Sequence, residues 1–166
     1  KCLGFCLLLL AAGSAAAGRL DYISVTHEKN EYRVFVSAWL EMSQPELRKL
    51  LTDFPKAMQA SPAIRSIQML KPPKEGVTRA KAQIDACVWF FCKQLVQVQD
   101  LELLGAGHLK ATIIPELSDY KKGHANWRMI REGEGSRLLF DVMVEPDFWV
   151  PPLIGPAIIE RKLKSE

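Results

Sequence analysis

Three histidines, His27, His108 and His124, are the side chains of this sequence best suited to acid–base or metal chemistry. None has the H-x-x-x-H spacing that places two metal ligands on one face of a helix, and no cysteine or carboxylate cluster lies nearby. A zinc site is therefore not expected. The sequence also lacks a G-x-S-x-G motif, a P-loop and a G-x-G-x-x-G motif, and it indicates no cofactor.

The carboxylates on predicted strands offer one candidate base. Period-two alternation directs Asp85, Asp141 and Glu145 outward. Asp100 lies on the same row as two valines of its strand and could face inward, where burial would raise its pKa and suit it to act as a base. A solvated outer face is the favoured interpretation. The sequence therefore predicts no catalytic residue and favours, without deciding, a protein that is not an enzyme.

The segment CVWFFC, residues 87–92, is the most distinctive local feature. A continuous strand would place Cys87 and Cys92 on opposite faces and too far apart to bond. If the four residues between them form a hairpin tip, the two cysteines become opposed across the strands and a disulfide is geometrically feasible. The loop it closes is short, so the entropic stabilisation is at most about 2–3 kcal/mol.

The tip itself consists of Val88, Trp89, Phe90 and Phe91. Large apolar side chains at an exposed hairpin end mark a surface for a membrane or a protein partner, and tryptophan favours the bilayer interface. The alternative is that the tip folds under the C-terminal helix and belongs to the core. The sequence leaves both interpretations open.

The first 17 residues have the features of a signal peptide. Lys1 precedes an apolar run from Leu3 to Ala12, and the alanines that end at Ala17 form an A-x-A cleavage site. We expect an exported, periplasmic protein with a single domain over residues 18–166. Only two cysteines would remain, and an even pair in an exported protein favours a disulfide. Because the sequence begins with lysine, we expect it to be truncated at the start, and the last helix to stop early.

Composition narrows the class of partner. The 166 residues suffice for one domain with a core, and 48% hydrophobic and 25% charged residues are ordinary for a globular protein. The net charge of +3 is weak and no basic stripe is present, so we expect no nucleic-acid partner. The oligomeric state stays open.

Alternating apolar patterns and turn signals predict an α+β domain of about seven antiparallel strands, one early helix and one late helix. Ser43 and Glu46 form a capping box for the early helix. We expect Trp39 to pack on the outer face of its strand or under a helix. Residues 118–123 read as a polar loop, with a strand following over His124–Arg131.

The strand Val77–Cys87 has an unusual inward row. Its outward row is polar, whereas the inward row contains Ala80, Ala82, Ile84 and Ala86. Small side chains facing a core leave room, so this row indicates one wall of a cavity. The alternative is that a helix approaches the sheet closely there.

The C-terminal segment Asp147–Leu163, DFWVPPLIGPAIIERKL, follows a predicted strand over Arg137–Glu145. Together with CVWFFC it resembles the START-like (SRPBCC) superfamily, which includes polyketide cyclases/dehydrases, lipid transport proteins and coenzyme-Q-binding-like proteins. The resemblance implies a helix-grip fold: a curved antiparallel sheet around a long C-terminal helix, with an apolar cavity between them. The fold by itself fixes no activity.

The favoured hypothesis is binding or transport of an apolar small molecule, such as a lipid, quinone or polyketide-like compound. Burial would supply the affinity, at about 0.8 kcal/mol per CH₂. The hairpin tip and the proline-rich segment before the last helix would form the entrance and touch a membrane. The candidate lining residues are Ala80, Ala82, Ile84, Trp127, Met129, Phe140, Val142, Ile154 and Ile158.

Two alternatives remain. The resemblance includes polyketide cyclases and dehydrases, and an inward-facing Asp100 or His108 would favour such an enzyme. A third hypothesis is a packed domain that docks a protein partner through its aromatic hairpin tip.

Overall fold

The structure is a computed structural model that describes residues 18–53, 56, 63–88, 91–151 and 155–164. The predicted signal peptide, residues 1–17, lies outside the described residues. The helices are α1 (Gln44–Thr52), the 3₁₀ helix η1 (Pro115–Leu117) and α3 (Pro156–Lys164). The strands are β1 (Gly18–Glu28), β2 (Glu31–Leu40), β3 (Ile64–Leu70), β4 (Val77–Val88), β5 (Phe91–Leu103), β6 (His108–Ile113), β7 (Tyr120–Glu132) and β8 (Gly135–Pro146).

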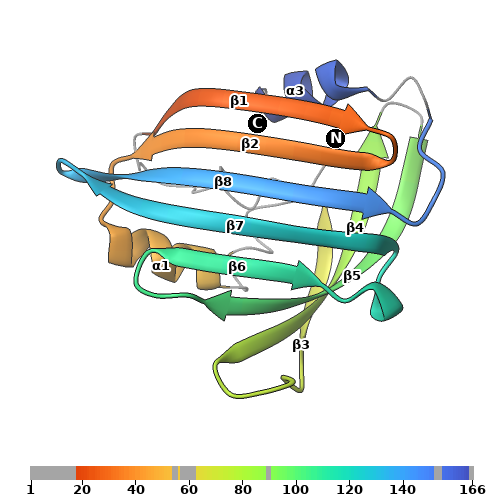
Figure 1. Ribbon diagram of the computed structural model, residues 1–166, viewed down its shortest axis with the longest axis horizontal. Helices are drawn as coiled ribbons and strands as arrows, with labels where there is room; N and C mark the ends of the chain where they lie inside the picture. Colours follow the sequence, from red (N-terminus) through yellow and green to blue (C-terminus); the bar gives the residue numbers. More distant parts are fainter. Residues whose placement is uncertain (1–17, 54–55, 57–62, 89–90, 152–154, 165–166) are drawn as a thin grey trace.

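All described strands belong to one antiparallel sheet in the order β1-β2-β8-β7-β6-β5-β4-β3. Figure 1 shows that the sheet is strongly curved: β1, β2, β8, β7 and β6 run side by side, while β5 and β4 turn away. The described sheet has eight strands where the sequence predicted about seven. The antiparallel α+β architecture is as expected, with the short edge strand β3 paired only to β4.

The sequence predicted the described α-helices α1 and α3 to different extents. At the start of α1, the Ser43 backbone nitrogen donates to Glu46 Oε2 at 2.9 Å, as expected for the capping box. The helix α3 contacts β1 and lies beside that edge of the sheet (Figure 1). It spans nine residues, so the long C-terminal helix implied by the resemblance is not confirmed.

The strand β7 begins earlier than predicted. Residues 120–123, expected as a loop, already pair with β8 and carry a register shift between Tyr120 and Lys122. Lys122 Nζ forms ion pairs with the carboxylates of Glu145 on the adjacent strand β8 and of Glu31 on β2, the next strand beyond it. These cross-strand pairs explain why a polar, lysine-containing segment is strand rather than loop.

Apolar residues on the concave face of the sheet form two core clusters, a larger first and a smaller second. The buried residues of the first cluster are Val25, Val34, Leu40, Leu47, Ala80, Leu101, Leu109, Ala111, Ala125, Trp127, Met129, Leu138, Phe140, Val142 and Ile159. Those of the second are Ala63, Ile84, Leu95, Ile113 and Tyr120. Apart from Leu47 and Ile159, which come from the helices, and Ala63, which precedes β3, the members of both clusters are strand residues on the inward rows.

Trp39 packs on the outer face of β2, as expected. Its indole Nε1 donates to the carbonyl oxygen of Glu132 at 3.4 Å. A Cβ added to Gly135 would lie 2.6 Å from the Trp39 ring and 2.3 Å from the carbonyl oxygen of Leu40. The close approach of β2 to the start of β8 therefore requires glycine at position 135.

Candidate functional site

The concave face brings together most of the predicted lining residues. Ala80, Trp127, Met129, Phe140 and Val142 all belong to the first core cluster. The Trp127 and Phe140 rings, cross-strand partners, have centroids 5.1 Å apart. On β4, Ile84 is buried in the second cluster, and Ala82 packs against it. These residues lie on one face because cross-strand partners project to the same side.

Two predicted lining residues come from the C-terminal segment. Ile154 lies outside the described residues. Ile158 is half-buried in α3, and its neighbour Ile159 is the residue of this helix that belongs to the first core cluster.

The row of β5 that faces inward is not the row of valines. Gln97 and Gln99 pair with Ala82 and Ala80 of β4, so the glutamines share the concave face with the alanines. Asp100 lies on the opposite face, where its carboxylate accepts two hydrogen bonds from Arg79, at 2.6 and 2.7 Å. This ion pair agrees with the solvated-face interpretation and removes the candidate base from the interior.

His108 also lies on the outer face. Its Nε2 is 3.2 Å from Asn126 Oδ1, and Asn126 Nδ2 donates to Asp141 Oδ2 at 3.2 Å. These side chains project opposite to the buried Leu109, Ala125 and Trp127. Neither residue that would favour an enzyme, Asp100 or His108, therefore contacts the interior.

The interior glutamines are functional candidates that the sequence analysis missed. Gln97 is only 2% exposed, and its Nε2 donates to Gln99 Oε1 at 2.6 Å. Within the described part of the chain, Gln97 Oε1 and Trp127 Nε1 are buried and have no hydrogen-bond partner. The interior is thus apolar with a small number of unsatisfied polar atoms, which is the composition of a small-molecule site.

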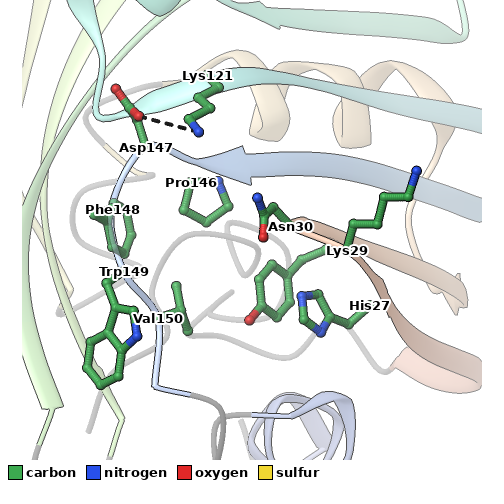
Figure 2. Close-up of a pocket in the computed structure, with 10 residues that line it drawn as sticks. His27, Lys29, Asn30, Lys121, Pro146, Asp147, Phe148, Trp149 and Val150 are labelled. Carbon is green, nitrogen blue, oxygen red and sulfur yellow. Dashed lines mark ion pairs between the residues drawn. The ribbon is translucent and has the colours of Figure 1, made fainter.

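A pocket of about 460 Å³ lies at the end of the sheet where the β1–β2 hairpin and the segment after β8 meet. Figure 2 shows Phe148, Trp149 and Val150 on one side of it, and His27 and Lys29 on the other. The lining residues are His27, Lys29, Asn30, Tyr32, Lys121, Pro146, Asp147, Phe148, Trp149 and Val150. Its volume falls in the usual range for ligand sites, about 300–1,000 Å³.

The pocket adjoins both core clusters. Tyr32 and Val150 pack against the first cluster, and Phe148 packs against the second. The Tyr32 ring stacks on His27 with centroids 4.2 Å apart. Burial raises the pKa of the Tyr32 hydroxyl above its ordinary value, so this hydroxyl is neutral at physiological pH.

The rim of the pocket is polar and bears charge of both signs. Lys121 Nζ lies 3.9 Å from the Asp147 carboxylate, an ion pair drawn in Figure 2. Trp149 is 69% exposed at the same rim. The pocket therefore combines aromatic and aliphatic side chains with charged and polar groups.

The hairpin between β4 and β5 lies next to this pocket. Lys93 Nζ is 5.0 Å from the centroid of the Phe148 ring, which connects the start of β5 to the segment after β8. Cys87 and Cys92 are cross-strand partners and form a disulfide, as predicted. The strands extend further than expected, to Val88 and Phe91, which pair with each other.

The prediction of a four-residue tip is therefore wrong, because the paired strands are separated by two residues, Trp89 and Phe90. Both lie outside the described residues. Whether the tip is core or a contact surface stays a prediction.

Across the described ranges no group of three or more His, Cys, Asp or Glu could hold a metal ion. The same residues contain no helix long and apolar enough to cross a membrane.

Comparison with solved structures defines the class of fold. A START superfamily protein from Mycobacterium smegmatis matches with a TM-score of 0.62 and 16% identity, over 80% of this chain and 89% of that chain. The Zhui aromatase/cyclase from Streptomyces sp. R1128 matches with a TM-score of 0.62 and 12% identity, over 81% and 86%.

A STAR-related lipid transfer protein from Xanthomonas axonopodis matches with a TM-score of 0.58 and 12% identity, over 84% of this chain and 90% of that chain. The chain therefore has a START-like fold, as the C-terminal and CVWFFC segments indicated. No protein-family model and no curated protein matches the sequence.

Proposed function

We propose that this protein binds or transports an apolar small molecule, of the lipid, quinone or polyketide-like class, on the concave face of its sheet. The observation that carries the proposal is the pocket of about 460 Å³. The predicted lining residues do not line it, but three residues that do, Tyr32, Phe148 and Val150, pack against the two core clusters of the concave face. The aromatic segment after β8 and the β1–β2 hairpin flank the entrance.

Burial is the source of affinity. Each CH₂ that leaves water contributes about 0.8 kcal/mol, so a tail of ten carbons supplies most of the free energy of micromolar binding. Structural neighbours described as a lipid transfer protein and as an aromatase/cyclase have the same fold and support a hydrophobic ligand in general terms.

We further propose that the protein is exported to the periplasm after cleavage of residues 1–17, and that it contacts a membrane peripherally at the pocket rim. The exposed Trp149 supports this, because tryptophan partitions into the bilayer interface. A cyclase or dehydrase remains the second candidate through the fold alone. Its proposed acid–base residues, Asp100 and His108, lie on the outer face.

The proposal is tested by uptake of N-phenyl-1-naphthylamine, a neutral probe that fluoresces in apolar surroundings. The wild-type protein should bind the probe saturably. In Val150→Trp the larger side chain fills the pocket, and we expect the affinity to fall at least about tenfold, or 1.4 kcal/mol.

The matched control is Ile130→Trp, which adds the same side chain on the outer face of β7, where Ile130 is exposed. This variant should bind the probe as the wild-type protein does. Equal affinity in Val150→Trp and wild type would show that the ligand does not use this pocket.

A further inference from the structure

Gln97 and Gln99 of β5 are two uncharged polar side chains that face the concave interior. They occupy consecutive positions of the inward row of this strand. Gln97 is 2% exposed, and its cross-strand partner is Ala82. The next residue on the same row of β5, Leu95, is buried in the second core cluster beside Ile84. Gln97 thus projects from a wall that is otherwise small and apolar.

The hydrogen bonding of this pair is incomplete in the described part of the chain. Gln97 Nε2 donates to Gln99 Oε1 at 2.6 Å, and Gln97 Oε1 is buried without a partner. If the oxygen and nitrogen of the Gln97 amide are exchanged, one polar end is still left unsatisfied. A buried unsatisfied polar group lowers stability, so such an atom in a native interior calls for an explanation.

The surroundings define what could satisfy it. Arg79, Lys81, Asp85 and Asp100 alternate with the alanine and glutamine rows and lie on the other face. On the glutamine row itself the charged residue is Lys93, two positions beyond Leu95, and its Nζ lies over the Phe148 ring. A charged ligand group would therefore be buried near Gln97 without a counter-ion, which is costly. A neutral group carries no such cost.

We infer that Gln97 and Gln99 recognise a hydroxyl group on the apolar ligand. A hydroxyl can donate to Gln97 Oε1 and accept from the Gln99 amide nitrogen at the same time. Among the described residues, Trp127 Nε1 is a second buried atom of the concave face without a partner, and it provides a donor for a further ligand oxygen. The inference rests on the proposed function and adds that the ligand is an alcohol rather than a hydrocarbon.

The test compares two ligands of equal size, 1-decanol and its isosteric ether 1-methoxynonane, as competitors of N-phenyl-1-naphthylamine. In the wild-type protein decanol should bind about fivefold to tenfold more tightly than the ether, because only the alcohol donates a hydrogen bond. In Gln97→Leu the two ligands should bind equally, with the ether at least as tight as in the wild type.

Two further variants keep the result interpretable. Gln94→Leu makes the same change on the outer face of β5 and should retain the preference for decanol, since Gln94 is exposed and pairs with Asp85. Gln99→Leu removes the other half of the pair and should weaken the preference. Thermal unfolding of each variant establishes that it is folded.

The outcomes separate the two proposals. Equal affinity of the wild-type protein for decanol and the ether would overturn the hydroxyl inference and leave apolar binding intact. An undiminished preference in Gln97→Leu would also overturn it. Failure of decanol to displace a bound probe would likewise overturn the hydroxyl inference, whereas failure of the probe to bind would overturn the proposed function itself.

Discussion

Ala82 and Gln97 face each other across β4 and β5, and they show what single residues do to the interior of this sheet. The alanine contributes a small side chain to the concave face, and the glutamine places a buried polar atom beside it. The alanine row had two interpretations from sequence, a cavity wall or a close helix contact. A substitution at residue 82 distinguishes them.

We predict that Ala82→Phe keeps its stability and loses its ligand. If the alanine lines open space, the new ring occupies it, so the unfolding free energy should change by less than about 1 kcal/mol while probe affinity falls about tenfold or more. Denaturant unfolding and probe titration measure the two quantities. Gln83→Phe, on the exposed face of the same strand, is the control and should alter neither.

The opposite result has an equally clear meaning. A loss of about 1–3 kcal/mol in Ala82→Phe, the usual cost of overpacking, would show that another element already fills this space. The alanine row would then reflect close packing, and the cavity-wall interpretation would be wrong.

The inward-facing rows of β4 and β5 were not equally predictable from the sequence. Over residues 79–86 of β4, polar and apolar residues alternate, so the inward row was assigned correctly. On β5, Val96 and Val98 share a row with Asp100, and the sequence left open whether this row faces inward while favouring a solvated outer face. The backbone N–H groups of Val96 and Val98 donate to the side chains of Asp119 and Ser118, which flank η1. The glutamines of the other row face inward. Only the register with β4 reveals this.

At the scale of elements, Arg137 joins the strands at one end of the sheet. From β8 its guanidinium reaches Asp21 on β1 at 2.6 Å, Ser37 on β2 at 3.1 Å and the Glu132 carboxylate on β7. Hydrogen bonds from Arg19 and Arg137 lower the pKa of Asp21, and the bond from Arg137 lowers the pKa of Glu132. The same contacts raise the pKa of the Arg137 guanidinium.

The sign of the pH dependence follows from the lowered carboxyl pKa values. A carboxyl group with a depressed folded-state pKa stabilises the fold above its unfolded pKa, about 4, and loses that contribution as pH falls through the folded value. Arg137→Met should therefore lower Tm at pH 7, and its difference from wild type should shrink as pH falls toward 3.

Arg131→Met is the matched control for this measurement, because Arg131 is exposed on β7 and the described residues give it no ion pair. Its Tm should follow the wild-type value across the pH range. A wild-type advantage over Arg137→Met that is constant from pH 7 to pH 3 would contradict the assigned role of these carboxylates.

The ends of strands β4, β5 and β7 were harder to predict than the strands themselves. The opposed cysteines of the β4–β5 hairpin were predicted from strand geometry, and the disulfide is formed. The length of the connection was not, because apolar residues such as Val88 and Phe91 fit a paired strand as well as a loop. The start of β7 was missed for a related reason: the cross-strand ion pairs of Lys122 are not visible in a linear pattern.

At the scale of the whole molecule, the START-like fold creates one curved sheet, and the pocket beside Phe148 lies at one end of it. The sequence indicated this fold through its C-terminal segment and the CVWFFC segment. It did not indicate the pocket, because the pocket walls come from β1, β2, β7 and the segment after β8, which only the folded sheet brings together.

Native mass spectrometry of the protein purified from an exporting host, followed by solvent extraction, tests the central claim most directly. We predict a bound apolar molecule that carries a hydroxyl group, released on denaturation, and a protein mass lower by two hydrogens because of the Cys87–Cys92 disulfide. A ligand-free mass, with no uptake of added lipids, quinones or long-chain alcohols, would contradict the account.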